Sequence, residues 1–215
     1  MSSLKKSSLL CALAGTALIA GCGSASKTGA GAPTSAPSSA SSTQTAGGSP
    51  GQAGALSGEA GSTATGDIPD NQVFLVFTNR TAGYSIKYPE GWTQSGSVRD
   101  VTFRDKNNIV HVLIASGAAP TPASVSAQLN GLKSSNPTLS FQPPTPIRLR
   151  SGSAVKAVYT TQSAPNPVTG KRVTLVVDRY ELAHGGQVAT VDLGTPKGVD
   201  NIDAYRMMIE SFRWL

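Results

Sequence analysis

The clearest pattern of apolar and polar positions in this chain of 215 residues lies in the stretch YSIKYPEGW, residues 84–92. Tyr84, Ile86 and Tyr88 alternate with polar residues, and this period of two predicts a strand with one apolar, aromatic face. A proline and a glycine follow, and they predict a turn that brings Trp92 back towards the sheet.

Other short apolar runs, separated by turn residues, predict further strands. Residues 73–78 form one β-rich run. The remaining runs occur in pairs that are joined by clusters of Asn, Asp, Gly or Ser, and each pair predicts a hairpin. The three predicted hairpins are 101–104 with 109–115, 147–150 with 154–161, and 172–182 with 187–193.

Two segments show apolar residues at helical spacing instead. The first predicts a helix that begins near Thr121 or Ser124, either of which is a good N-cap, and ends before Pro137. The second predicts a helix over about residues 199–211. The apolar faces of the two helices are formed by Val125, Leu129 and Leu132 and by Ile202, Tyr205, Ile209 and Phe212.

These elements together predict an α+β fold. Strands that follow one another through short turns favour an antiparallel β-sheet in meander order, and the amphipathic helices are expected to pack on one or both of its faces. The strands and helices account for residues 71–215, a length that suits one domain with one core.

Composition divides the rest of the chain into two parts. Residues 22–70 consist almost wholly of Gly, Ala, Ser, Thr and Pro, with Leu56 and Ile68 as the large apolar residues. So little apolar surface cannot offset the entropy lost on ordering, so this segment is predicted to be a disordered linker. Residues 1–21 have the form of a secretory signal peptide.

The signal segment ends in a recognisable motif. Its apolar run, Leu9–Ala20, is shorter than the roughly 20 residues that cross a bilayer, so a removable signal is expected. The stretch LIAGC resembles the lipobox of bacterial lipoproteins. The resemblance implies cleavage between Gly21 and Cys22, lipidation of Cys22 with acyl chains such as palmitate, and anchoring on the extracytoplasmic face of a cell membrane or outer membrane. An ordinary signal with a chance cysteine is the alternative.

Cysteine count and charge narrow the chemistry further. The other cysteine, Cys11, lies in the signal segment, so a processed chain would have neither a disulfide nor a thiolate metal site. Loss of Lys5 and Lys6 with the signal leaves 16 basic and 12 acidic residues, a net charge of +4. A basic surface suits anionic headgroups or acidic envelope partners, or is simply solvated. Nucleic acid is not expected as a partner, because the location is extracytoplasmic and no nucleic-acid-binding motif is present.

Aromatic residues are candidates for a ligand groove between the sheet and a helix. The favoured interpretation is that they pack in the core, and the alternative is that they line a cavity for an apolar or amphipathic ligand. The candidate groove residues are Tyr84, Tyr88, Trp92 and Tyr159, with Tyr180 as a further one.

Catalytic and metal-binding patterns are sparse. His111 lies in the apolar run IVHVLI and is predicted to be structural, while His184 in a glycine-rich turn is predicted to be exposed. A hydrolase that uses His111 with Asp178 or Asp192 is a third possibility. The sequence has no HExxH, GxSxG or SxxK motif, and no phosphate-binding loop between a strand and a helix. No catalytic residue, metal site or cofactor is therefore predicted.

Two stretches of the predicted domain resemble one family. YSIKYPEGW at residues 84–92 is similar to the strand and turn near the start of PsbP-like domains, and NIDAYRMMIESFRW at residues 201–214 is similar to their closing helix. That superfamily, Mog/PsbP, includes bacterial lipoproteins of the LpqN type and an extrinsic protein of photosystem II. The resemblance implies an α/β/α sandwich and a non-enzymatic domain that binds or stabilises partner proteins.

The sequence therefore favours a membrane-anchored, non-catalytic envelope lipoprotein that acts as an accessory or protein-binding module, with an envelope protein as its partner. A carrier of a small apolar or amphipathic ligand is the alternative. A hydrolase is the weakest of the three hypotheses.

Overall fold

The computed structural model describes residues 66–215. The predicted signal peptide 1–21, the lipobox with Cys22, and the predicted linker as far as residue 65 lie outside the described residues. No helix within residues 66–215 has the length and apolar character needed to cross a membrane.

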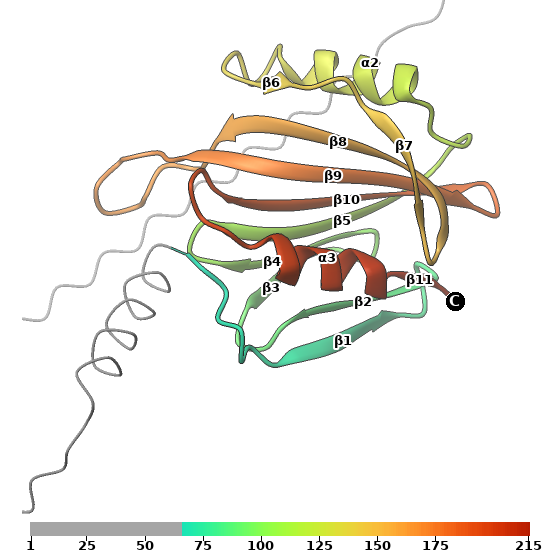
Figure 1. Cartoon of the computed structure of the whole chain (residues 1–215), viewed down its shortest axis with the longest axis horizontal. Coiled ribbons are helices and arrows are strands. Elements are labelled where there is room, and N and C mark those ends of the chain that lie inside the picture. The colour runs from blue at the N-terminus through green and yellow to red at the C-terminus, as the bar shows by residue number, and fades with distance from the viewer. Residues whose placement is uncertain (1–65) are drawn as a thin grey trace, which may run out of the picture. The chain divides into compact units, whose positions relative to one another are not determined.

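An eight-stranded antiparallel sheet forms the centre of the fold (Figure 1). Its strand order is β3-β4-β5-β10-β9-β8-β6, and β7 also pairs with β8. Two meanders, β3-β4-β5 and β8-β9-β10, meet where β5 pairs with β10. The strands are β3 (Thr93–Gly96), β4 (Asp100–Asp105), β5 (Asn108–Ser116), β6 (Ser140–Phe141), β7 (Thr145–Leu149), β8 (Gly152–Gln162), β9 (Thr174–His184) and β10 (Gln187–Pro196).

The three hairpins predicted from the sequence are all present. In the hairpin of β9 and β10, the connecting residues Gly185 and Gly186 both have positive φ, 55° and 77°. Two successive positive φ values suit a type I′ turn, whose twist matches that of the flanking strands, and glycine adopts them without strain. The turn thereby sets the register of β9 and β10, in which His184 lies opposite Gln187.

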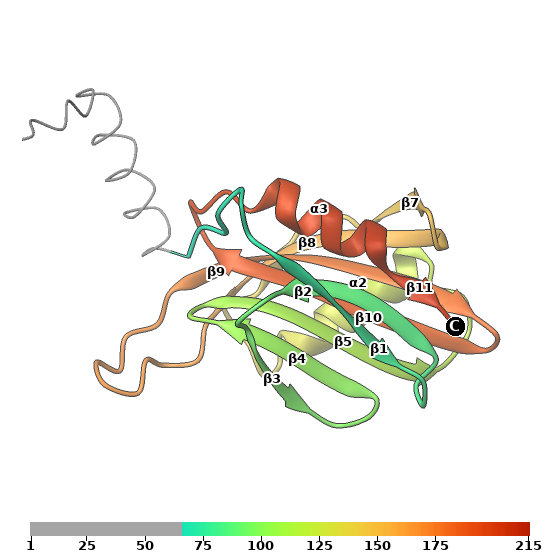
Figure 2. The ribbon, with the colours of Figure 1, turned by 90° about the horizontal axis from the view of Figure 1, so that it is seen from below.

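A second, three-stranded sheet packs across one face of the large sheet (Figure 2). Its order is β1-β2-β11, and all of its pairs are antiparallel. The strand predicted around Tyr84, Ile86 and Tyr88 is the central one. The bounds are β1 (Phe74–Asn79), β2 (Tyr84–Pro89) and β11 (Arg213–Trp214).

The two faces of the large sheet are covered by different helices (Figure 1). Helix α3 (Ile202–Ser211) lies beside β2 on the face that also carries the three-stranded sheet. Helix α2 (Pro122–Leu132) lies on the opposite face against β8. Thr121 is the N-cap of α2, as predicted, because its side chain and that of Ser124 each accept a hydrogen bond from the other's backbone N–H.

The core is accordingly divided into two clusters by the large sheet. The larger cluster lies between the sheet, α3 and the three-stranded sheet, and includes Phe103, Val112, Val191 and Phe212. The smaller cluster lies under α2. The predicted α+β fold of antiparallel strands with helices on both faces is confirmed. The order of strands is not a single meander, since β5 lies between β4 and β10 and does not pair with the next strand in sequence, β6.

Two further predictions need correction. Ile202 was expected on the buried face of the last helix, but it is exposed at the start of α3, and Met208 is buried instead. The packed chain also begins before residue 71. Ile68, which was assigned to the linker, is buried against the larger core cluster, because hydrogen bonds hold the backbone around it in place.

Asn201, immediately before α3, holds this early segment. Its side-chain oxygen accepts a hydrogen bond from the backbone N–H of Ile68 at 2.8 Å. Its side-chain nitrogen donates to the carbonyl of Gly66 at 3.1 Å and to Thr195 Oγ1 at 2.9 Å. Asn108, also buried, donates to the same Gly66 carbonyl. Two buried amides therefore tie residues 66–68 to the sheet and to the start of α3, and Asn201 makes most of the hydrogen bonds.

Replacing Asn201 by Ala is expected to lower the free energy of unfolding by about 1–3 kcal/mol, because buried backbone groups would lose their partners. Urea unfolding followed by tryptophan fluorescence measures the change. Asn130→Ala, at an exposed position of α2, is the matched control. Equal stability of the two variants would contradict the role given to Asn201.

Candidate functional site

The predicted groove residues do not line one groove. Tyr84 and Trp92 are buried in the larger core cluster and Tyr88 packs against it, whereas Tyr159 belongs to the cluster on the other face of the sheet. Tyr84 stacks on Phe212 with ring centroids 5.7 Å apart. Burial raises the pKa of Tyr84 to about 12. The interpretation of these aromatics as core residues is therefore the one that fits their positions.

A polar cluster lies instead on the α2 side of the sheet, and strand alternation explains it. Val110, Val112 and Ile114 of β5 enter the larger core cluster, so the intervening His111 points to the other face. The register of β5 and β10 places Asp192 directly opposite His111. The sequence offered Asp178 and Asp192 as possible partners for His111, and Asp192 is the one that lies next to it.

Asp192 is held chiefly by Arg179 of β9. Arg179 Nε and Nη2 donate to the two carboxylate oxygens of Asp192 at 2.8 and 2.7 Å. Both residues are buried, 8% and 7% exposed. Burial alone would raise the pKa of Asp192, but the hydrogen bonds from Arg179 and the charge of His111 hold that pKa below its usual value. The pair is therefore ionised and mutually neutralised.

Both ring nitrogens of His111 face carboxylates. Nε2 lies 2.9 Å from Asp100 Oδ1, a hydrogen bond across β4 and β5. Nδ1 lies 3.7 Å from Asp192 Oδ2, which is beyond hydrogen-bond distance, so that contact is electrostatic. Asp192 and Asp100 outweigh burial and raise the pKa of His111 above its usual value.

The other residues considered for catalysis lie elsewhere. Asp178 forms an ion pair with Lys156 at 2.7 Å and accepts a hydrogen bond from the Tyr180 hydroxyl. Tyr180 belongs to the larger core cluster, on the opposite face of the sheet from His111. His184 is exposed, as predicted, and stacks on Trp214 with centroids 5.9 Å apart. Neither Asp178 nor His184 joins the cluster around His111.

A recess of about 360 Å³ opens beside this cluster. Tyr159, with Arg179 5.4 Å from the centre of its ring, lies at one side, and His111 and Asp192 lie in the floor. Gly194 and Val177 also line it, and a Cβ on Gly194 would lie 3.2 Å from a Val177 methyl group. The remaining lining residues are Thr102, Arg104, Ile109, Thr161, Gln162, Ser163, Ala164 and Leu175.

The cluster is poorly arranged for general-base catalysis. A general base needs a free nitrogen within reach of the proton that it accepts, but the two nitrogens of His111 are directed at Asp100 and Asp192. Within residues 66–215, no Ser, Thr or Cys side chain makes a hydrogen bond to His111. The paired charges stabilise one another and shape the recess.

Arg179 is the member of the cluster that sequence reasoning missed. The signal was its position inside TLVVDRYELA, where a cation on a strand of a covered sheet needs a carboxylate partner. Glu181, two residues on, points to the same face and is also buried. Burial raises its pKa, and Gln128 of α2 donates a hydrogen bond to one of its oxygens at 3.1 Å.

No protein-family model matches the chain, and no curated sequence is similar to it. Among solved structures, the chain is similar to cyanobacterial PsbP (CyanoP) from Synechocystis, with 14% identity and a TM-score of 0.48 over 71% of this chain and 99% of that one. It is also similar to the Ran-binding protein Mog1p of Saccharomyces cerevisiae, with 9% identity and a TM-score of 0.45 over 67% and 96% of the two chains. These likenesses assign neither a family nor a function to the chain.

Arg179→Met is expected to lower the free energy of unfolding by about 3–5 kcal/mol, because it leaves the charge of Asp192 buried without a partner. The double variant Arg179→Met/Asp192→Leu removes that charge and should recover much of the loss. Urea unfolding of the three proteins measures both effects. A double variant as unstable as Arg179→Met would contradict the importance of the ion pair.

The raised pKa of His111 also predicts a pH dependence. Stability from the protonated imidazole is fully present below the unfolded-state pKa, near 6.5, and is lost as the pH rises through the higher folded-state pKa. The stability difference between wild type and His111→Asn should therefore be larger at about pH 5.5 than at about pH 9. His184→Asn makes the same substitution at an exposed position and is the control. If the stability difference between wild type and His111→Asn does not change with pH, the raised pKa assigned to His111 is refuted.

Proposed function

We propose that the chain is a lipid-anchored, non-catalytic binding module on the extracytoplasmic face of a bacterial membrane, where it associates with an envelope protein. The anchor rests on the lipobox LIAGC with Cys22, and the long linker of small residues would give the domain reach from the membrane. Membrane attachment thus comes from the N-terminal segment, and recognition from the domain.

One observation carries the non-catalytic part of the proposal. The buried charges at the recess are already paired with one another, and both nitrogens of His111 are directed at carboxylates. A set of this kind gives a rigid polar support beneath the recess, whereas proton transfer would require one of its ion pairs to break.

A carrier of a small ligand is the second candidate function. It is supported by the recess of about 360 Å³, a volume within the range typical of small-molecule sites. The walls combine apolar side chains such as Leu175 and Val177 with hydroxyl groups, which suits an amphipathic ligand. Of the aromatic residues predicted to form a groove, Tyr159 lines this recess.

The anchor is tested by Cys22→Ser in the native host. We expect the variant to move from the membrane to the soluble fraction and to lose metabolic labelling with a clickable palmitate analogue. Cys11→Ser, within the predicted signal, is the matched control and should remain labelled and membrane-bound. A Cys22→Ser protein that stays labelled would refute the lipoprotein assignment.

Binding and carriage are separated by two measurements on the full chain. In-cell crosslinking should recover an envelope protein above background, and failure to do so would count against the binding module. Native mass spectrometry of protein from its own host would show a bound ligand if the domain is a carrier, and Thr161→Phe should abolish it by filling the recess. For the hydrolase alternative, loss of an envelope activity in His111→Ala would reverse the non-catalytic assignment.

A further inference from the structure

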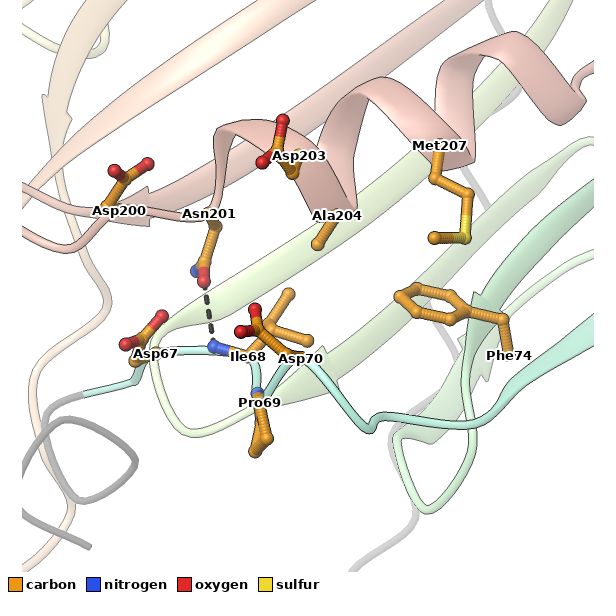
Figure 3. A pocket seen from close by; sticks show the side chains of 10 residues that line it. All are labelled: Asp67, Ile68, Pro69, Asp70, Phe74, Asp200, Asn201, Asp203, Ala204 and Met207. Carbon is orange, nitrogen blue, oxygen red and sulfur yellow. Dashed lines mark hydrogen bonds between the residues drawn. The ribbon is translucent and has the colours of Figure 1, made fainter. Parts of the chain in front are cut away.

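A groove lies on the other side of the molecule, between α3 and the segment that leads into β1 (Figure 3). Its volume is about 370 Å³. Residues 67–74 form one wall and residues 200–207 form the other. The hydrogen bond from the Ile68 backbone to Asn201 joins the two walls at 2.8 Å. The groove is therefore preformed rather than a gap between independent segments.

One end of the groove is apolar. Phe74 and Met207 face one another across it, and Ala204 lies next to them on α3 (Figure 3). Met207 is 44% exposed, whereas other apolar residues of α3 are buried in the core. Methionine is flexible and polarizable and is common on surfaces that adapt to apolar partners. This end can take an apolar side chain from another molecule.

The rest of the groove is acidic. Asp67, Asp70, Asp200 and Asp203 line it, four of the 12 carboxylates in the whole chain. Arg206 pairs with Asp203 at 2.7 Å. Within residues 66–215, no cation forms an ion pair with the other three. A protein with net positive charge therefore concentrates unneutralised negative charge beside an exposed apolar surface.

We propose that this groove docks a segment of a partner protein that carries a lysine or arginine side chain next to an apolar one. Charge complementarity selects the cation, and the space between Phe74 and Met207 accepts the apolar side chain. A metal ion fits less well, because the described residues contain no cluster of three or more ligands placed to hold one. The inference rests on the proposed binding function and assigns a surface to it.

The direct test is fluorescence anisotropy of the full chain with two fluorescein-labelled peptides, one of alternating Lys and Leu and one of alternating Glu and Leu. We expect the Lys/Leu peptide to bind with an affinity that falls as salt is raised, and the Glu/Leu peptide not to bind. Equal binding of the two peptides would overturn the proposal, because charge would then not select the partner.

Variants locate the binding. Asp67→Asn/Asp70→Asn/Asp200→Asn keeps the shape of the groove and should weaken Lys/Leu binding about tenfold. Arg206→Gln should strengthen it, because it removes a competing cation from Asp203. Met207→Ser should weaken it through the apolar end. Asp105→Asn, at an exposed carboxylate at the end of β4, removes one charge outside the groove and should have no effect.

Four further outcomes would overturn the docking assignment. Unchanged peptide binding by the triple variant would place the site elsewhere. Displacement of the peptide by about 1 mM CaCl2, with no effect of 3 mM NaCl, would indicate a divalent-cation site. Self-association that the triple variant abolishes, measured by sedimentation equilibrium, would indicate a second copy of the chain as the occupant. If the triple variant retains the in-cell crosslinks, the groove assignment fails while the binding function stands.

Discussion

The antiparallel pairing of β5 with β10 is the contact on which the rest of the domain depends. It joins two meanders that are separate in sequence, and its register runs from Gln187 opposite Ser116 to Gly194 opposite Ile109. This register sends Val112 and Val191 into the larger core cluster and His111 and Asp192 to the opposite face. A slip of one residue in either strand would turn its charged residue into the core. The hydrophobic contrast between the two faces therefore specifies both the sheet and the position of the polar cluster.

Buried polar groups then fix what hydrophobic contact alone leaves open. Apolar side chains tolerate small shifts of one element against another, but an unpaired amide or charge in the interior costs about 1–3 kcal/mol or more. Arg179 and Asp192 restrict β9 and β10 to the register in which they meet. Asn201 restricts residues 66–68 to the one position at which its amide is satisfied. Both sets stabilise a particular arrangement more than they stabilise the folded state in general.

Sequence-based prediction succeeded for features that depend on residues close together in the sequence, and it failed for features that depend on distant ones. Alternation around Tyr84 and the helical spacing of Val125 and Leu129 are local, so the strand and α2 were predictable, as were hairpins with short turns. The pairing of β11 with β2 joins residues near the two ends of the domain, and no local pattern encodes it. The same limit applied to Tyr159, since periodicity shows that one side of a strand is buried but not which layer covers it. Arg179 and Asp192 were each visible in the sequence, but only the pairing of β9 with β10 shows that they meet.

The proposed docking groove lies next to the first residues of the folded domain. One of its walls, residues 67–74, starts at the segment that Asn201 holds against the sheet. A bound segment that touches both walls has a higher affinity for the state in which they are joined, so its binding free energy adds to the stability of that junction. The wall that would contact a partner also begins within the segment predicted as linker, because residues 67–70 pack on the domain. A partner that fills the groove would therefore stabilise the packing of residues 66–68 against Asn201, and pulling on the chain before residue 66 would in turn weaken the binding of the partner.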